Sequence, residues 1–189
     1  NQILWPLLHS FPERVVIRDD AYRAYQRVNH RFAGALMPIL EKGDVVWVQD
    51  YHLFLVGQEL RKLGWGGKLG FFLHIPFPPS EVFAILPWAR EVLEGLLAYD
   101  RIGLQTPRYA NNLIDTLVTE VGGVANGDNF ASADGRVSVG AYPIGIDADD
   151  FATWSAEEES QESGGLLRRI PHRQIFILGV YSVYYTKGI

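Results

Sequence analysis

Cysteine is absent from this 189-residue sequence, and a long apolar run is absent too. Without cysteine the chain forms neither disulfides nor thiolate zinc sites, which fits an intracellular, cytoplasmic setting. No apolar run approaches the roughly 18 residues that cross a bilayer, and residues 1–6 do not resemble a signal peptide, so we expect no membrane association. Basic charge is in deficit, with 17 Lys and Arg against 22 Asp and Glu, which disfavours nucleic acid as a partner.

What remains is an ordinary globular composition, with 48% hydrophobic and 21% charged residues. This composition argues against disorder, and the length suffices for one domain with a real core or slightly more. The chain does not open on methionine, and its last residues, 187–189, come directly after a strand-like run. We therefore expect both ends to be cut from a longer protein.

Helix-like and strand-like patterns alternate along the chain. Apolar residues at helical spacing predict helices over residues 21–37, 53–63, 88–98 and 108–121, with a short helix beginning at Ser80. Short apolar runs predict strands over residues 44–49, 68–74, 100–105, 136–142 and 174–180. This alternation is typical of an α/β fold with a doubly wound, mostly parallel, Rossmann-like sheet.

Turn and capping residues add further expectations about local structure. Asp19 or Asp20 is expected to cap the helix over residues 21–37, Ser80 to cap the short helix, and Pro107 to be a first helical residue. Residues 124–135 are interpreted as a turn-rich connector. We expect residues 1–148 to form one domain, 149–172 an acidic linker with some helix, and 173–189 the start of a second domain.

Two successive predicted strands end in polar side chains. The first is followed by Asp50, and the second ends at His74, after which Pro76 and Pro78 force an extended turn. Because open α/β sheets bind ligands at the carboxyl ends of their strands, these residues outline an active-site cleft. Asp50 could alternatively be a metal ligand, an acid/base group or a helix cap, and His74 a base or a histidine bonded to backbone carbonyls.

Two further residues have a functional and a structural interpretation. Trp5 precedes Pro6, so its stiff indole could line a sugar site or simply pack in the core. Lys187 follows a predicted strand where a helix should begin, which suits a diphosphate or an ordinary surface position. The histidines at positions 9, 30 and 172 lack metal-ligand spacing.

Taken together, these segments resemble the trehalose-6-phosphate synthase family of retaining glycosyltransferases. The matching segments, in chain order, are Leu4–Pro6, Val46–Leu53, Gly70–Pro78, Leu86–Trp88, Pro143–Asp147 and Tyr185–Gly188. The resemblance implies the GT-B arrangement, in which two Rossmann-like domains face each other across a cleft. The N-terminal domain would hold the phosphorylated acceptor and the C-terminal domain the nucleotide sugar, usually UDP-glucose.

The family resemblance also implies a reaction and roles for individual residues. Glucose would pass from UDP-glucose to glucose 6-phosphate with retention and without a metal ion or other cofactor, giving trehalose 6-phosphate. As candidate catalytic and substrate-binding residues, Asp50 would hold sugar hydroxyls and His74 would seat the transferred glucose. Trp5 would line the acceptor pocket, and Lys187 would neutralise the donor diphosphate. The resemblance leaves open whether the protein is a homo-oligomer.

Several positions depart from the family pattern. Gln49 replaces the usual histidine, and Ser182 stands where an arginine would bind phosphate, which could impair activity or indicate a non-catalytic sugar-phosphate-binding member. The segment Leu8–Pro12 is more similar to glucosylglycerol-phosphate synthases, whose acceptor is glycerol 3-phosphate. The family's N-terminal glycine-rich loop and most of its donor-binding domain are expected to lie outside this sequence. We therefore predict that the isolated chain does not turn over.

Overall fold

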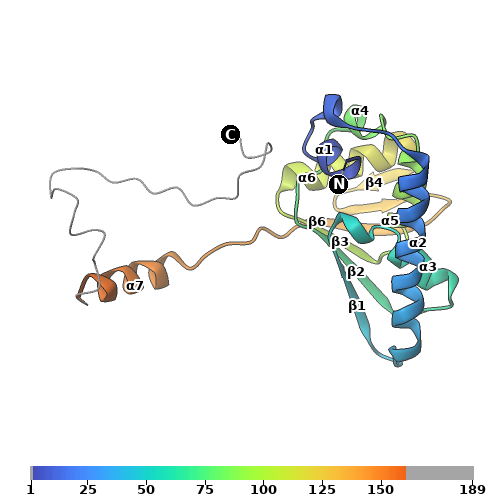
Figure 1. Ribbon diagram of the computed structural model, residues 1–189. Coiled ribbons are helices and arrows are strands. Elements are labelled where there is room, and N and C mark those ends of the chain that lie inside the picture. Colours follow the sequence, from blue (N-terminus) through green and yellow to red (C-terminus); the bar gives the residue numbers. More distant parts are fainter. Residues whose placement is uncertain (1, 161–189) are drawn as a thin grey trace. The chain divides into compact units, whose positions relative to one another are not determined.

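The computed structural model describes residues 2–160 of the chain, with side chains described as far as residue 154 (Figure 1). The chain divides into two compact units, Asn1–Pro143 and Ile144–Ile189. The predicted strand over residues 174–180, Ser182 and Lys187 all lie outside the described residues. Within the second unit, the described part contains helix α7 (Ala148–Ser160), where the sequence predicts a linker with some helix.

The first unit contains a six-stranded, mostly parallel sheet. Its strands are β1 (Val45–Gln49), β2 (Lys68–Leu73), β3 (Arg101–Leu104), β4 (Val124–Asn126), β5 (Asn129–Ala131) and β6 (Arg136–Ala141). The spatial order is β1-β2-β3-β6-β5-β4, in which the first four strands are parallel and β5 and β4 form an antiparallel hairpin. The predicted α/β class with a mostly parallel sheet is confirmed.

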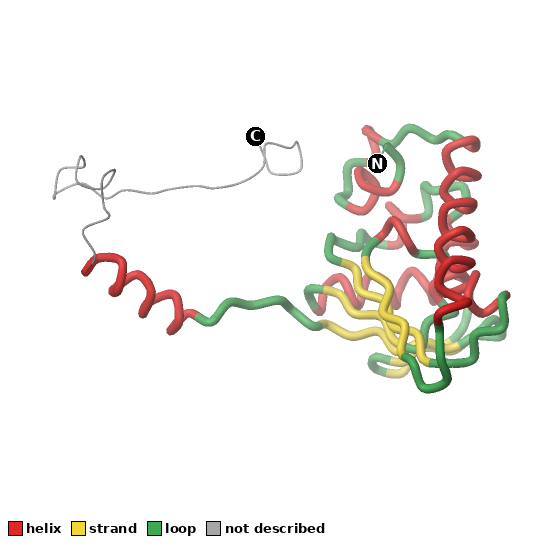
Figure 2. The backbone as a smooth tube through the Cα atoms, turned by 60° about the horizontal axis from the view of Figure 1, so that its bottom comes forward, coloured by secondary structure: helices red, strands yellow, loops and turns green. Residues whose placement is uncertain are grey.

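Helices precede the first strand and connect the parallel strands (Figure 2). They are α1 (Leu4–Leu8), α2 (Asp19–Leu36), α3 (Val56–Lys62), α4 (Ser80–Phe83), α5 (Ala89–Leu96) and α6 (Pro107–Thr116). A π-helical turn, Leu117–Val121, continues α6, and short 3₁₀ turns cover Pro12–Arg14, Met37–Ile39 and Tyr51–Leu53. Pro107 begins α6 as predicted, and the Thr106 hydroxyl oxygen caps it by accepting the Tyr109 N–H.

The other predicted helix caps are wrong. The cap position of α2 is Arg18, without a side-chain capping bond, and Arg18 instead pairs with Asp20 at 2.6 Å. That ion pair competes for the carboxylate that the helix N–H groups would otherwise attract. Ser80 is the first helical residue of α4 rather than its cap, because Pro79 occupies the cap position.

The interpretation of residues 124–135 as a connector is also wrong, because this segment contains the β4–β5 hairpin. Asn126 pairs with Asn129 across a tight turn in which Gly127 has φ +55°. Only Phe130 of the two short strands is buried, so their sequences lack the alternating apolar pattern by which strands are recognised. The Asn-Gly dipeptide was the signal that could have identified the turn.

The core lies on one face of the sheet. Val46 and Val48 of β1 are buried, whereas Val45 and Trp47, which point to the opposite face, are 68% and 67% exposed. The same alternation continues in β2, whose buried residues are Leu69, Phe71 and Leu73. None of the helices in the described residues combines the length and apolar character needed to span a membrane. A cytoplasmic location stays a prediction.

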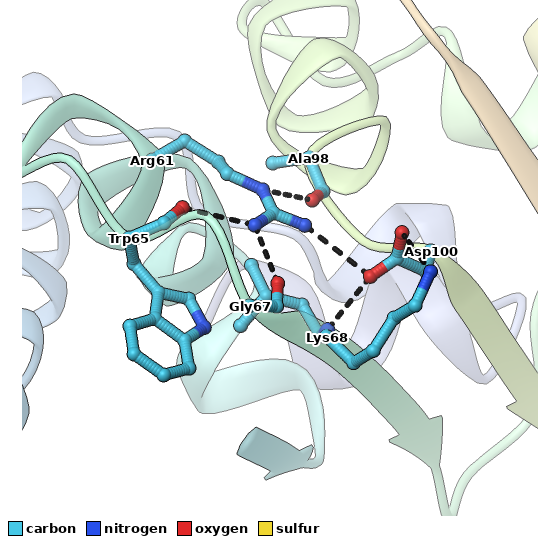
Figure 3. Close-up of polar contacts among 7 residues, drawn as sticks. Arg61, Trp65, Gly67, Lys68, Ala98 and Asp100 are labelled. Carbon is cyan, nitrogen blue, oxygen red and sulfur yellow. Dashed lines mark hydrogen bonds and ion pairs between the residues drawn. The ribbon is translucent and has the colours of Figure 1, made fainter. Parts of the chain in front are cut away.

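A polar network closes the amino-terminal edge of the sheet (Figure 3). Arg61 of α3 donates to three backbone carbonyls and to the carboxylate of Asp100, at 3.3 Å. The carbonyls belong to Trp65, Gly67 and Ala98, at 3.0, 2.7 and 3.2 Å. Asp100 also accepts the Leu69 N–H at 2.8 Å and lies 3.7 Å from the Lys68 ammonium group. These contacts fix the loops that lead into β2 and β3.

Candidate functional site

The structure brings the ends of the first two strands together at the carboxyl edge of the sheet. Gln49, the last residue of β1, pairs with Phe72 of β2. The Asp50 N–H extends this ladder by donating to the Phe72 carbonyl at 2.8 Å. His74 follows Phe72 by two residues, so its side chain leaves β2 on the same face as that of Phe72. Polar groups from two neighbouring strands therefore share one edge.

Asp50 has an unusual backbone conformation. Its dihedral angles, φ 69° and ψ 163°, lie in a region that essentially only glycine occupies. A side chain in such a region costs on the order of 1–3 kcal/mol, and such strain concentrates at functional sites. The conformation allows β1 to end in a sharp turn while the carboxylate stays at the sheet edge.

The carboxylate of Asp50 is incompletely bonded. Its Oδ1 atom is buried and has no hydrogen-bond partner among the described residues. The side chain makes no capping bond to the following turn, so the helix-cap alternative is wrong. A buried, unpartnered carboxylate oxygen is energetically unfavourable unless a ligand supplies donors.

Asn29 of α2 holds the turn that follows Asp50 from behind. Its side chain is fully buried and donates from Nδ2 to the His52 carbonyl at 3.1 Å. Its Oδ1 accepts the N–H of Leu55 at 3.1 Å. A single amide thus satisfies two backbone groups that would otherwise be orphaned in the interior.

Two tyrosine hydroxyls complete this support. The Tyr25 hydroxyl donates to the Tyr51 carbonyl at 2.7 Å and accepts the Phe54 N–H at 3.1 Å. The Tyr99 hydroxyl accepts the Gly57 N–H at 2.9 Å. Burial raises the pKa of both Tyr25 and Tyr99, so both hydroxyls stay neutral and keep their protons for donation. The strained residue is therefore anchored from the core side.

His74 is exposed and contacts side chains. Its Nε2 atom lies 2.7 Å from Oε1 of Gln49, and its ring packs against Phe72 with centroids 4.9 Å apart. The alternative in which His74 bonds backbone carbonyls finds no support among its hydrogen bonds in the described part of the chain. Sequence reasoning treated Gln49 only as a mild departure and missed this contact.

Trp5 lies next to the same turn. Its indole packs against the ring of His9 at 4.2 Å and against Tyr51 at 5.9 Å. The His9 ring is held in turn by a 2.8 Å bond between Nδ1 and the Trp5 carbonyl. Because Tyr51 directly follows Asp50, the structure places Trp5 beside the candidate site, half-buried rather than in the centre of the core.

An apolar cavity of about 300 Å³ lies behind the turn. Tyr51 and His52 form part of its wall, and Tyr22 and Trp88 stack at 4.2 Å with nearly parallel rings on another side. Asp50 and His74 are not among its lining residues. Its predominantly apolar lining suits a hydrophobic group better than a phosphate.

The described residues contain no cluster of side chains suited to bind a metal ion. Within residues 2–160, no group of three or more His, Asp or Glu side chains is arranged to hold a metal ion. The metal-ligand alternative for Asp50 therefore lacks support among the described residues. The expectation that the reaction needs no metal stays a prediction.

Comparison with known proteins identifies the family. The sequence model of glycosyltransferase family 20 matches residues 1–189, the whole chain. The chain belongs to glycosyltransferase family 20. Among relatives of this family, a bifunctional trehalose-6-phosphate synthase/phosphatase from Thermoproteus tenax is 39% identical over 191 residues, covering 100% of this chain and 26% of the relative.

Solved structures of family 20 proteins agree with the fold. A UDP-forming α,α-trehalose-phosphate synthase from Burkholderia xenovorans, in complex with glucose-6-phosphate, matches with a TM-score of 0.81 and 34% identity. The match covers 89% of this chain and 38% of that one. A structure from E. coli bound with UDP-2-fluoro glucose matches with a TM-score of 0.73 and 33% identity, over 84% and 38% of the two chains. This chain thus spans only about a quarter to two fifths of these proteins.

Proposed function

We propose that this chain forms the acceptor side of a retaining glucosyltransferase that transfers glucose from UDP-glucose to glucose 6-phosphate, giving trehalose 6-phosphate. Family membership and the names of the relatives support this activity. The observation that carries the proposal is the carboxylate of Asp50, held on a glycine-like backbone with a buried, unpartnered oxygen at the sheet edge. Residues 1–148 would then be most of the acceptor domain.

In this proposal the protein positions the sugars instead of supplying a carboxylate pair. The free oxygen of Asp50 accepts hydrogen bonds from hydroxyls of the transferred glucose, which satisfies the buried atom. His74, one strand away, makes a second contact to the same sugar. Two fixed contacts on rigid strand ends restrict the orientation of glucose before bond cleavage, which lowers the entropic part of the barrier.

The acceptor and the diphosphate are assigned to other parts of the chain. Trp5 would line the acceptor pocket, and its contact with Tyr51 supports a position beside the glucose site. Lys187, by family resemblance, would neutralise the charge that develops on the leaving diphosphate. The donor is UDP-glucose in this proposal, and no protein carboxylate takes the acceptor proton, which passes to the leaving diphosphate.

Glycerol 3-phosphate is a second candidate acceptor. The segment Leu8–Pro12 is similar to glucosylglycerol-phosphate synthases, and His9 of this segment packs directly on Trp5. This segment therefore contacts the proposed acceptor wall through His9. A smaller acceptor would need fewer contacts there, so this segment is the place where acceptor choice would be decided.

The test is an acceptor competition on the protein that carries this chain. We expect UDP release from UDP-glucose that depends on glucose 6-phosphate, and none from the 189-residue chain alone. Use of glycerol 3-phosphate but not glucose 6-phosphate would replace the trehalose assignment with the second candidate. Calorimetric binding of glucose 6-phosphate without any turnover would instead indicate a non-catalytic sugar-phosphate-binding protein.

A further inference from the structure

Gln49 is hydrogen-bonded to His74. The two side chains come from adjacent parallel strands and meet at 2.7 Å, between Oε1 of the amide and Nε2 of the imidazole. Gln49 is half-buried at the end of β1, and its pairing with Phe72 fixes its place in the sheet. The His74 ring is confined on another side by the Phe72 ring. The Gln49 amide therefore contacts Nε2 of a His74 ring whose orientation is restrained.

The amide carbonyl of Gln49 determines whether Nε2 of His74 is protonated. Oε1 of Gln49 faces Nε2, and because a carbonyl oxygen only accepts hydrogen bonds, this arrangement requires Nε2 to carry the proton and donate it. In the neutral imidazole the other nitrogen, Nδ1, then has a lone pair and can only accept.

We propose that Gln49 is a positioning residue that holds His74 in the Nε2–H tautomer, so that Nδ1 is presented as a hydrogen-bond acceptor to a sugar hydroxyl. This inference deepens the proposed function and, for the sugar contact, rests on it. The tautomer itself is a property of the chain and can be measured without substrate. Because the carboxamide is uncharged, it orients the ring without adding charge beside Asp50.

The direct test is ¹⁵N NMR of the His74 ring in the 189-residue chain. We expect a protonated Nε2 and an unprotonated Nδ1 when the imidazole is neutral. Gln49→Met removes the acceptor at similar volume and is expected to give a mixture of tautomers, whereas Gln49→Glu keeps an acceptor and should keep Nε2–H. Gln26→Met removes a hydrogen bond from a side-chain amide to Glu91 and none to His74, so it is the matched control and should leave the His74 spectrum unchanged.

Three results would overturn the inference: a predominant Nδ1–H tautomer in the wild-type chain, the same tautomer ratio in Gln49→Met, or a change of equal size in Gln26→Met. A second measurement uses kcat/KM for UDP-glucose in the protein that carries this chain. Gln49→Met should lower it about fivefold, as expected for one neutral hydrogen bond. A correct tautomer with no glucosyl transfer would refute the proposed function and leave the tautomer assignment intact.

Discussion

The amino-terminal and carboxyl edges of the parallel sheet differ in how completely their polar groups are hydrogen-bonded. At the amino-terminal edge, Arg61 and Asp100 satisfy carbonyls, a backbone N–H and each other (Figure 3). At the carboxyl edge, Asp50 keeps a buried oxygen without a partner and a backbone in a glycine-only region. The charged residues at the amino-terminal edge hold loops in place. At the carboxyl edge, Asp50 has an unsatisfied oxygen and a strained backbone.

This difference separates a structural role from a functional one. A satisfied network lowers the energy of the folded chain and gains nothing from a ligand. An unsatisfied carboxylate on a strained residue raises that energy, and a ligand with hydroxyl donors recovers it. Mutations at the two edges should therefore affect different quantities: stability at the amino-terminal edge and activity at the carboxyl edge.

The largest expected effect is that of Asp50→Asn on activity. The substitution keeps the shape of the side chain and removes its charge, so hydrogen bonds from sugar hydroxyls weaken or are lost. We expect kcat/KM of the protein that carries this chain to fall about 100-fold, with no loss in the free energy of unfolding. Steady-state kinetics and urea denaturation measure the two quantities. Unchanged kinetics would remove Asp50 from the site.

Arg61→Met should show the reverse pattern. It leaves three carbonyls without their donor and removes one of the partners of Asp100, which keeps the Leu69 N–H and Lys68. The Arg61 side chain is 31% exposed, so water can replace part of the loss. We expect the free energy of unfolding to fall by about 2 kcal/mol, with kcat per folded molecule unchanged. Arg23→Met, on the exposed face of α2, is the control and should change stability by less than about 0.5 kcal/mol. A purely kinetic effect of Arg61→Met would contradict the comparison.

A smaller effect of the opposite sign is expected for Asp50→Gly. Glycine adopts the observed φ and ψ without strain, although it gains more entropy in the unfolded chain. The net result should be a chain that is more stable by about 1 kcal/mol and inactive in the full protein. Chemical denaturation of the variant beside Asp50→Asn isolates the backbone contribution. Equal stability of the two variants would show that the backbone of Asp50 carries no strain.

The smallest effect is a pH dependence at Glu59 of α3. Partial burial by itself raises the pKa of this carboxyl, but bonds from Lys62 and His30 outweigh it and hold the pKa below its ordinary value of 4.5. The contribution to stability is therefore complete above about pH 4.5 and is lost as the pH falls through the lower folded-state pKa. We expect the free energy of unfolding of wild type to be higher than that of Glu59→Gln by less than about 1 kcal/mol at pH 7, and this difference should disappear in acid. A difference that is constant between pH 7 and pH 3 would exclude this linkage.

Local patterns in the sequence were sufficient for the parallel strands and their order along the chain. The runs ending at Gln49 and Leu73 are apolar, and the residues after them disfavour continuation, so both signals act within a few residues. The β4–β5 hairpin was missed for the same reason, because strands of three mostly exposed residues carry almost no pattern. The predictions of helix caps were wrong where a neighbouring residue occupied the cap position, Arg18 in α2 and Pro79 in α4.

The residues of the candidate site could be predicted from the sequence, but their hydrogen bonds and backbone conformation could not. Asp50, His74 and Trp5 were located from sequence motifs, and their roles stay predictions. The turn that follows Asp50 is held by Asn29, whose side chain donates to the His52 carbonyl 23 positions along the chain. The bond between His74 and Gln49 joins residues 25 positions apart. No local pattern encodes contacts of this kind.

Apolar periodicity and short motifs are enough to predict the α/β class, the family and the positions at which polar residues end the strands, because these features are local in the chain. Which carboxylate has hydrogen-bond partners and which lacks them is visible only in the folded chain. That distinction depends on donors brought together by folding: Arg61 reaches Asp100, and none of the described residues reaches Oδ1 of Asp50. Hydrogen bonds act over about 3 Å in space, and distance along the chain does not specify them.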